Sequence, residues 1–517
     1  MRIKHSIINI AAGLANQVII TSLSFISRTV FITYLGVEYL GISGLFTSIL
    51  AMLALAEAGV GSSIVYSLYK PVAENDYEKI NVLMKLYKKA YLVIAAVVFS
   101  LGVAIMPFIG FFIKDTNIEH VHLIYFIFLM NTVLPYLYLH KNNFLNVCQK
   151  TYIVTGIYSV SSILSVVLKI AILYYTQNFI LYLIVDCVLT VITSILLAII
   201  VNKKYSFLKN KVTTTLDSDT KKNIFKNIKA ILLQNIGTYL VFGTDNIIIS
   251  SFVGVAAVGL YSNYNMLIEI CRTFIYQFSS NIYHSVGNLV AKENKEKVYS
   301  IYKVTMLLNF WLYSLFGILL FILLDPFIAL WVGSEFLLGD TVLILLIIIF
   351  YERGMRNAIS TVKTTAGIFH ADRYAPLCQA AVNLVVSIVL VQSMGIAGVF
   401  LGTLISALAV PFWITPYLVY KKVFKKSLIH YFAQYLYYAV VAMGVYFLAN
   451  FICSFLTEST FFMLVIKALV CLTVINIIYV IVFHRTKEFK YLVGIFKNIL
   501  DTVWGSYRLK KLKGDIA

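Results

Sequence analysis

Long apolar runs separated by short polar segments dominate the sequence. A helix needs roughly 20 apolar residues to cross about 30 Å of hydrocarbon. Six such runs lie before residue 202, at 7–33, 40–68, 84–113, 120–147, 151–175 and 178–201. Eight more follow, at 224–251, 257–287, 301–331, 338–367, 373–394, 396–420, 431–456 and 461–484. The pattern predicts an all-α polytopic membrane protein with about fourteen transmembrane helices.

The chain resembles itself when it is shifted by 218 residues, because Val37 then meets Val255 and Gly41 meets Gly259. Both copies read as helix, glycine-containing turn, helix and charged loop, so we expect two parallel-repeated six-helix lobes. The predicted parts are an N-lobe at 1–201, a cytoplasmic linker at 202–223, a C-lobe at 224–420, two extra C-terminal helices at 421–484 and a cytoplasmic amphipathic, basic tail at 485–517.

Composition and charge agree with a lipid environment. Of 517 residues, 60% are hydrophobic and only 13% are charged, which excludes ordinary soluble folds. The net charge of +19 would suggest nucleic acid in a soluble protein, but here the lysines gather in alternate loops, and the opposite loops hold essentially one cation, Lys114. This bias predicts that both termini lie in the cytoplasm, that the basic loops attract anionic lipids and that nucleic acid is not a partner.

Signatures of enzymes and metal sites are weak. The six cysteines lie singly in apolar stretches without histidines at ligand spacing, and no Walker A sequence is present. Asp217-Ser218-Asp219 is similar to the metal-binding DxD of glycosyltransferases, but no nucleotide-sugar domain surrounds it. We therefore predict no catalytic residue, no metal, no cofactor and no enzyme activity.

Charged side chains inside the apolar runs are the main functional signal, because a charge at bilayer depth costs about 2.5–3.5 kcal/mol. Arg353, Arg356, Ser360 and Lys363 step by three, four and three, so they share one helix face. We interpret this face as a cationic stripe that receives an anion, since guanidinium groups bind phosphate through two parallel hydrogen bonds. The alternative is that Glu352 neutralises Arg356 one turn away.

Further polar groups in other runs are candidates for the same cavity. Residues assigned to substrate binding are Arg28, Arg272, Arg353, Arg356, Lys363, Asn16 and Asn235. Residues assigned to coupling or gating are Glu57, Asp245 and Glu269. For Glu269 and Arg272 a self-contained ion pair is the alternative. We also expect Arg28 and Asp245 to approach each other and help close the outward side, and Lys169 and Asp186 to form a structural pair.

Three stretches resemble a known family. They are YLGVEYLGISGLFTSIL at Tyr34–Leu50, LAEAGVGSSI at Leu55–Ile64 and AGIFHADRYAPLCQAAVNLVVSIVLVQSMGIAGVFLGTLIS at Ala366–Ser406. In residue type and order they are similar to the Wzx-like polysaccharide (oligosaccharide) flippases of the multidrug/oligosaccharidyl-lipid/polysaccharide exporter superfamily. The resemblance implies two six-helix lobes that work by alternating access around a central cationic cavity.

The resemblance also implies a substrate, an undecaprenyl-diphosphate-linked oligosaccharide repeat unit. It would move from the inner to the outer leaflet of the bacterial cytoplasmic (inner) membrane for export of a surface polysaccharide such as capsule or exopolysaccharide, with a polymerase and glycosyltransferases as partners. Its diphosphate would meet Arg28, Arg272, Arg353 or Arg356, and coupling to H⁺ or Na⁺ stays open. The alternatives are a peptidoglycan-precursor flippase or a drug/cation antiporter of the same superfamily. A membrane glycan polymerase or ligase is disfavoured because the outer loops are short.

Overall fold

The computed structural model describes the backbone of residues 2–57, 59–116, 118–210, 216–292, 295–368, 371–456, 460–495 and 497. Within these ranges side chains are described from residue 18 onward, except at 56, 209, 219, 229, 230, 233, 234, 238, 242 and 278–292. All regular structure in the described residues is helical, which confirms the predicted fold class.

The helices form two compact units, each of which is discontinuous in sequence. Unit 1 holds residues 1–263 and 376–406, and unit 2 holds residues 264–375 and 407–517. The predicted lobe and linker boundaries, at 201, 224 and 420, come from the sequence repeat, whereas the two units are defined by contacts. The predicted boundaries therefore stay predictions.

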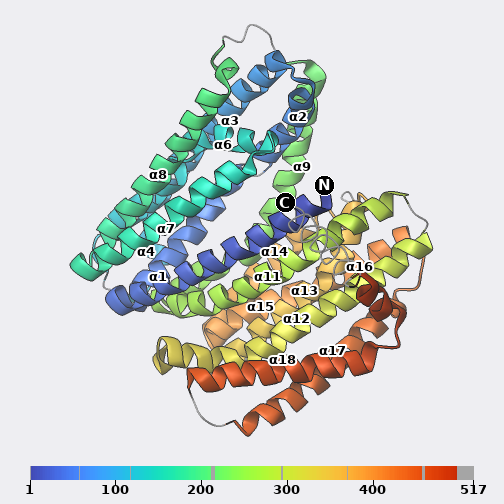
Figure 1. Cartoon of the computed structure of the whole chain (residues 1–517). Helices are drawn as coiled ribbons and strands as arrows, with labels where there is room; N and C mark the ends of the chain where they lie inside the picture. Colours follow the sequence, from blue (N-terminus) through green and yellow to red (C-terminus); the bar gives the residue numbers. More distant parts are fainter. Residues whose placement is uncertain are drawn as a thin grey trace, which may run out of the picture. The chain divides into compact units, whose positions relative to one another are not determined.

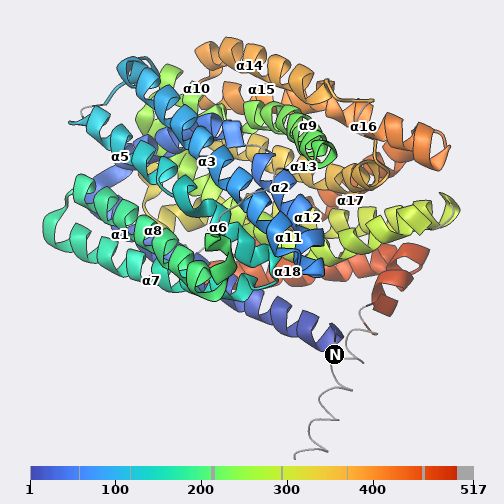
Figure 2. The same cartoon turned by 90° about the horizontal axis from the view of Figure 1, so that it is seen from above.

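Unit 1 begins with a long kinked helix and continues through a set of helical hairpins. Its helices are α1 (Arg2–Leu53), α2 (Val60–Glu74), α3 (Tyr77–Ile105), α4 (Ile109–Phe112), α5 (Val121–Val133), α6 (Tyr136–Val147), α7 (Thr151–Thr176), α8 (Phe179–Lys204), α9 (Ser218–Phe242), α10 (Asp245–Phe252), the first residues of α11 (Val255–Lys292), α14 (Ala375–Met394) and most of α15 (Ile396–Ala409). Within this unit α7 packs along α8 and against α1 (Figure 1), and α14 lies beside α15 (Figure 2).

Unit 2 holds the remaining helices. They are the rest of α11, α12 (Lys295–Trp331), α13 (Asp340–Thr365), α16 (Pro411–Val419), a π-helical turn at Tyr420–Phe424, α17 (Ile429–Ser454) and α18 (Phe461–Phe483). Its α12 contacts α13, α17 and α18, so α12 is the central helix of the unit.

Each of the fourteen predicted runs corresponds to helical structure, although several are broken or joined. In the described part of the chain, ten helices are long and apolar enough to cross a membrane. The run at 338–367 forms α13 but is not among these ten, because Glu352, Arg353 and Arg356 lie near its middle. The structure therefore agrees with a multi-pass membrane protein. The charged residues that make α13 a candidate for substrate binding also lower its hydropathy.

Two glycines that the predicted repeat aligns both have positive φ angles. α1 runs continuously through the first two predicted runs but kinks at Gly36, where φ is 82°. The repeat-related Gly254, in the turn between α10 and α11, has φ of 135°. Both values lie where a side chain is strained, so each copy needs glycine at this turn.

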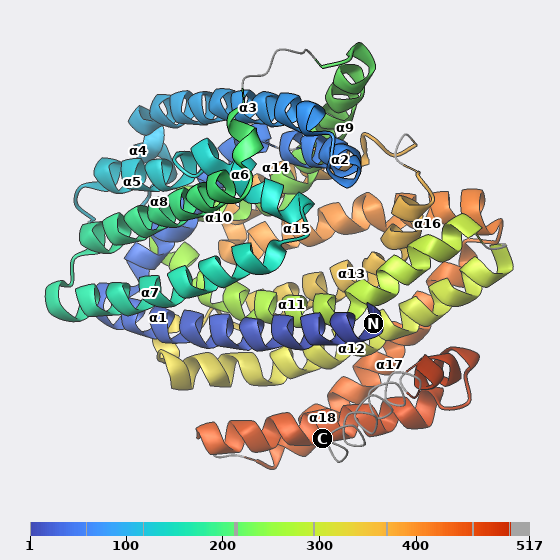
Figure 3. The same cartoon turned by 45° about the horizontal axis from the view of Figure 1, so that its top comes forward.

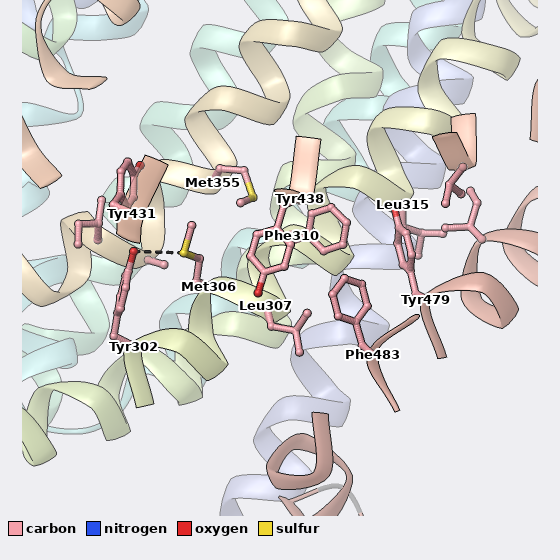
Figure 4. Packing of buried hydrophobic residues seen from close by; sticks show 14 of the residues in the cluster. Tyr302, Met306, Leu307, Phe310, Leu315, Met355, Tyr431, Tyr438, Tyr479 and Phe483 are labelled. Carbon is pink, nitrogen blue, oxygen red and sulfur yellow. Dashed lines mark hydrogen bonds between the residues drawn. The ribbon is translucent and has the colours of Figure 1, made fainter. Parts of the chain in front are cut away.

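The core of unit 2 is rich in aromatic rings (Figure 4). Phe310 of α12 stacks on Tyr438 of α17 with ring centroids 4.5 Å apart. Tyr479 of α18 donates to Ser314 Oγ of α12 at 2.7 Å, which satisfies a buried hydroxyl. The predicted extra helices α17 and α18 are therefore fastened to α12 by rings and by hydrogen bonds.

The opposite face of α17 is apolar and uncovered. Leu436, Val440, Met443, Phe447 and Phe451 follow one another at helical spacing, and each side chain is at least 58% exposed. Such a face is expected to contact lipid tails.

The first part of the predicted tail packs on unit 2. Phe489 stacks on Trp311 of α12 with ring centroids 5.7 Å apart, and Glu488 forms an ion pair with Lys303 at 2.6 Å. Leu492 is partly buried against the same core, so both apolar residues at the start of the tail contact protein. Residues 498–517 lie outside the described residues.

Candidate functional site

The candidate cationic stripe forms one face of α13, within unit 2. Arg353, Arg356, Ser360 and Lys363 are all partly exposed. The neighbouring face, with Met355, Ile359 and Val362, is buried in the unit 2 core. The four polar side chains therefore share a partly exposed face of α13, as their spacing predicts.

The arginines of this stripe lie close to carboxylates. Arg356 Nε lies 3.3 Å from Glu352 Oε1, as the alternative interpretation proposed, and the Glu352 side chain is only 5% exposed. The contact lacks hydrogen-bond geometry, since Glu352 Oε1 has no hydrogen-bond donor among the described residues. Glu352 thus offsets one charge of the stripe without using the hydrogen-bonding capacity of the guanidinium group.

A second helix adds charges to the same region. On α11, Arg272 forms an ion pair with Glu269, and the guanidinium lies 5.8 Å from the ring centroid of Phe350 on α13. Arg353 interacts electrostatically with Arg272, with Glu269 and with Arg356. Three arginines and two glutamates therefore gather between α11 and α13, and one positive charge remains in excess.

Lys363, at the end of the stripe, has a partner that the sequence analysis missed. Its Nζ forms an ion pair with Asp372 in the loop after α13, and the Asp372 side chain is 6% exposed. The charge of Lys363 is therefore largely offset, and since Glu352 offsets Arg356, the stripe is cationic mainly at Arg353.

Arg28 lies in unit 1, on α1. Its Nη1 is buried and has no hydrogen-bond partner among the described residues, and the side chain interacts electrostatically with Tyr182 of α8. Asp245, also in unit 1, accepts a hydrogen bond from Thr403 instead. The structure shows no ion pair between Arg28 and Asp245 in the described residues, so their predicted approach stays a prediction.

Asp245 lies at the centre of a buried polar cluster in unit 1. The residue is 5% exposed, and Thr403 Oγ1 donates to its Oδ1 at 3.3 Å. Asn383 Nδ2 donates to Thr403 Oγ1 at 2.9 Å, while Asn383 Oδ1 is buried without a donor in the described part of the chain. Ser387 donates to the carbonyl of Val399 at 3.1 Å on the adjoining turn. The cluster thus joins a carboxylate to neutral oxygen atoms from α14 and α15.

Asp245 is a candidate from the sequence, but the other residues of this cluster are not. Asn383, Ser387 and Thr403 lie in apolar runs at 20 residues or less from one another. The signal that was available is their spacing, because Asn383 and Ser387 are four residues apart and share a helix face.

The other candidates are placed as follows. Glu57, in the short 3₁₀ turn between α1 and α2, accepts a hydrogen bond from Tyr91 Oη at 2.6 Å. Asn235 is exposed on α9. The side chain of Asn16 lies outside the described residues. Lys169 and Asp186 form the predicted pair, with Nζ and Oδ1 2.7 Å apart.

Asp217, the first residue of the DxD-like sequence, has a structural role. Its carboxylate caps α9 by accepting from Thr220 N at 2.8 Å, and it lies 3.4 Å from Lys79 Nζ. The hydrogen bonds from the side chain and backbone of Thr220 lower the pKa of Asp217 to about 2.

Comparisons with known proteins agree on the fold. A family model described as "Polysaccharide biosynthesis protein" matches residues 7–283, which is more than half of the chain. No curated protein matches the sequence. The solved structure of the lipid II flippase MurJ in an inward closed conformation is similar, with a TM-score of 0.67 and 16% identity, over 91% of this chain and 98% of that chain.

Multidrug transporters are also similar in structure. A MATE family transporter of the MOP superfamily, in an inward-facing conformation, matches with a TM-score of 0.56 and 16% identity, over 75% of this chain and 92% of that chain. A mutant of the Vibrio cholerae MATE transporter VcmN matches with a TM-score of 0.58 and 16% identity, over 83% and 98%. At this identity the likeness concerns the fold, and together with the family match it confirms the resemblance seen in the sequence.

Proposed function

Since the chain belongs to the family of polysaccharide biosynthesis proteins, we propose that it is a flippase for an undecaprenyl-diphosphate-linked oligosaccharide. It would move this lipid from the inner to the outer leaflet of the bacterial cytoplasmic membrane by alternating access, for export of a surface polysaccharide. The observation that carries the proposal is the partly exposed arginine face of α13 beside Arg272 of α11.

This face suits a diphosphate for electrostatic reasons. Arg353 and Arg356 are held at the surface of a packed core, and the Glu352 contact leaves N–H donors of Arg356 available. Each N–H group that meets a phosphate oxygen forms a charge-assisted hydrogen bond, which is stronger than a neutral one. The diphosphate and sugars cannot cross hydrocarbon alone, whereas the polyprenyl chain can stay in lipid along faces such as that of α17.

The proposal is tested by transport in proteoliposomes with a fluorescent undecaprenyl-diphosphate-linked oligosaccharide. We expect Arg353→Gln to lower the rate about 10- to 100-fold, as for the loss of one or two hydrogen bonds to a charged group. Arg353→Gln and Arg356→Gln together should abolish transport. Arg373→Gln is the matched control, because Arg373 is exposed in unit 2 and lies over Tyr374, outside the stripe.

Folding is checked separately, because Arg356→Gln leaves Glu352 buried beside an uncharged group. A folded double variant, with the thermal midpoint of the control, that still transports at the normal rate would refute the role of the stripe.

For the coupling ion we propose the cluster around Asp245, with Na⁺ or H⁺ as the ligand. A carboxylate, a threonine hydroxyl and an asparagine oxygen that lacks a donor form an oxygen-rich set, which hard cations prefer. If Na⁺ binds, it should raise the thermal midpoint of the purified protein, and Asp245→Asn and Thr403→Val should each remove this effect. If H⁺ is the ligand, Na⁺ has no effect, and a pH gradient drives transport only while Asp245 is present.

The alternative substrates are distinguished by competition in the same assay. Lipid II would compete if the chain were a peptidoglycan-precursor flippase, and a cationic dye would compete in a drug antiporter. The match to MurJ covers 91% of this chain and those to the two multidrug transporters cover 75% and 83%, a difference in line with the extra helices α17 and α18. This supports a lipid-linked substrate over a drug.

Location and partners complete the proposal. We propose that both termini lie in the cytoplasm, that anionic lipids contact the basic loops, and that glycosyltransferases and a polymerase act before and after this step. Labelling of a cysteine introduced at Lys114 by an impermeant reagent from outside intact cells tests the orientation.

A further inference from the structure

A second polar site lies within unit 1. Helix α7 packs against both α1 and α8 (Figure 3). Side chains of these three helices line a partly open pocket of about 290 Å³, which is close to the lower end of the roughly 300–1,000 Å³ common for small-molecule sites. Seven of its thirteen lining side chains carry a hydroxyl group, and two more are Lys169 and Asp186. This is an unusual lining for helices whose outer surfaces are otherwise apolar.

The hydroxyl groups come from all three helices. They belong to Ser24 of α1, to Tyr158, Ser161, Ser162 and Ser165 of α7, and to Thr190 and Thr193 of α8. Thr190 donates to the carbonyl of Asp186 at 2.8 Å and Thr193 to that of Leu189 at 2.7 Å. Because a hydroxyl that donates to its own helix keeps acceptor lone pairs, these groups mainly offer acceptors to a ligand.

The ion pair fixes a carboxylate at the same pocket. Asp186 Oδ1 accepts from Lys169 Nζ at 2.7 Å and from Ser165 Oγ at 3.0 Å, while Asn131 Nδ2 lies 3.4 Å from Oδ2. Lys169 Nζ also lies 4.6 Å from the ring centroid of Tyr182. The side chains of Lys169 and Asp186 remain 15% and 32% exposed, so a ligand in the pocket can reach the ion pair.

Helix packing alone does not account for this arrangement. Small hydroxyl residues often allow membrane helices to approach closely and bond across the contact, as Ser161 and Thr193 do at 2.5 Å. The remaining hydroxyls do not close the space beside that contact, where the pocket persists. Apolar side chains such as Leu23 and Val166 line part of the wall, and Tyr158 adds an aromatic side chain that is 40% exposed.

We propose that this pocket binds one neutral sugar unit of the transported glycan. Sugar hydroxyls would donate to the serine and threonine oxygens and to Asp186, and the C–H face of the ring would contact the apolar wall and Tyr158. A neutral sugar fits because Lys169 and Asp186 offset each other's charge. The inference rests on the proposed function, since it identifies the part of the substrate that unit 1 recognises.

The test measures sugar binding directly, without transport. Methyl glycosides of glucose, galactose, N-acetylglucosamine and glucuronic acid are added to the full-length protein in nanodiscs, and saturation-transfer NMR reports binding. We expect at least one neutral glycoside to bind. Ser162→Ala with Thr190→Val, two hydroxyls outside the Ser161–Thr193 contact, should weaken its binding roughly fivefold per hydroxyl removed, and Ser162→Leu should abolish binding by filling the pocket.

Thr305→Val in unit 2 is the matched control, because Thr305, like Thr190, donates to the carbonyl four residues earlier, at 3.0 Å. The Thr305→Val protein should bind the glycoside as well as the wild type does. Unchanged binding in the folded pocket variants, no binding of any neutral glycoside, or binding of the glucuronide alone would each overturn the proposal.

Failure of the inference and failure of the proposed function give different results. If the wild-type protein transports the lipid-linked oligosaccharide but sugar binding ignores the pocket variants, only the inference falls. If pocket-dependent sugar binding is found but no lipid-linked oligosaccharide is transported, the flippase proposal falls and the sugar site stands.

Discussion

A methyl group added at Gly41 should weaken one closed contact of unit 1. A Cβ atom built at Gly41 would overlap the carbonyl oxygen of Val255, and it would lie 2.8 Å from the carbonyl carbon. The repeat-related Gly259 faces the carbonyl of Val37 in the same way, with Val37 Cγ2 at 2.7 Å. Since the atoms in the way are mainly backbone, neither contact can adapt by rotating a side chain.

The size of the effect follows from overpacking. Forcing an extra methyl group into a close contact costs about 1–3 kcal/mol. If the protein has a second conformation in which these helices separate, Gly41→Ala should favour it over the closed conformation. At about 1.4 kcal/mol per factor of ten, the population ratio of separated to closed should rise by roughly 5- to 150-fold. Gly259→Ala should act similarly.

The assay is the labelling rate of a cysteine at position 48. Ser48 lies two turns beyond Gly41 on α1 and accepts a hydrogen bond from Asn246 at 3.0 Å. In a cysteine-free background, an impermeant maleimide added from the predicted outer side should reach this partly exposed position faster when the contact opens. We expect Gly41→Ala to raise the rate by the factor above.

Two further glycine substitutions serve as controls. Gly110 on α4 has nothing within 4 Å of an added Cβ, so Gly110→Ala should leave the rate unchanged. Gly44→Ala meets side-chain atoms of Val258 and Ser262 at 3.0 and 3.1 Å, which can move, so its effect should be smaller. If Gly41→Ala and Gly259→Ala lower the thermal midpoint without changing the labelling rate, the glycines serve static packing and the reasoning is refuted.

Three further predictions concern charges with partners. Lys363→Met should lower the unfolding free energy by about 3 kcal/mol, because it leaves the buried Asp372 unpaired, and adding Asp372→Asn should restore most of the loss in thermal unfolding. Burial raises the pKa of the Glu488 carboxyl, but the hydrogen bond and charge of Lys303 outweigh this and hold it below its ordinary value. The attachment of this segment is therefore complete above the ordinary glutamate range and weakens as pH falls, and Lys303→Met should remove the pH dependence of its hydrogen exchange. Hydrogen bonds from the side chain and backbone of Thr220 lower the pKa of Asp217 to about 2, so Asp217 should cap α9 fully above about pH 4 and lose the cap as pH falls through about 2. Asp217→Ala should speed amide hydrogen exchange in the first turn of α9 at neutral pH, and an unchanged exchange rate would contradict the cap.

The fold could be predicted because each membrane helix carries its own signal in its length and composition. The repeat could be predicted for a similar reason, since Gly36 and Gly254 both need a backbone conformation that favours glycine. The breaks were not predictable in detail. The second run divides at the 3₁₀ turn Ala54–Glu57, and no proline precedes the break to signal it.

The candidate site was predicted only where residues lie on one helix. The face of α13 follows from spacing alone, and the contact of Glu352 with Arg356 follows from one helical turn. Contacts between helices do not follow from spacing. Thr403 holds Asp245 across 158 residues, and Asp372 reaches Lys363 from a loop, so the sequence named one partner of each pair and missed the other.

The two copies of the repeat share their packing glycines but not their charged residues. Gly41 and Gly259 occupy equivalent places and make equivalent backbone contacts, as two copies of one packing arrangement require. The charges do not repeat: Arg28 aligns with Asn246, and Asp245 with Ser27, at the same offset of 218. The proposed function agrees with this difference, because an asymmetric ligand such as a lipid-linked glycan or a coupling ion would meet the two copies differently.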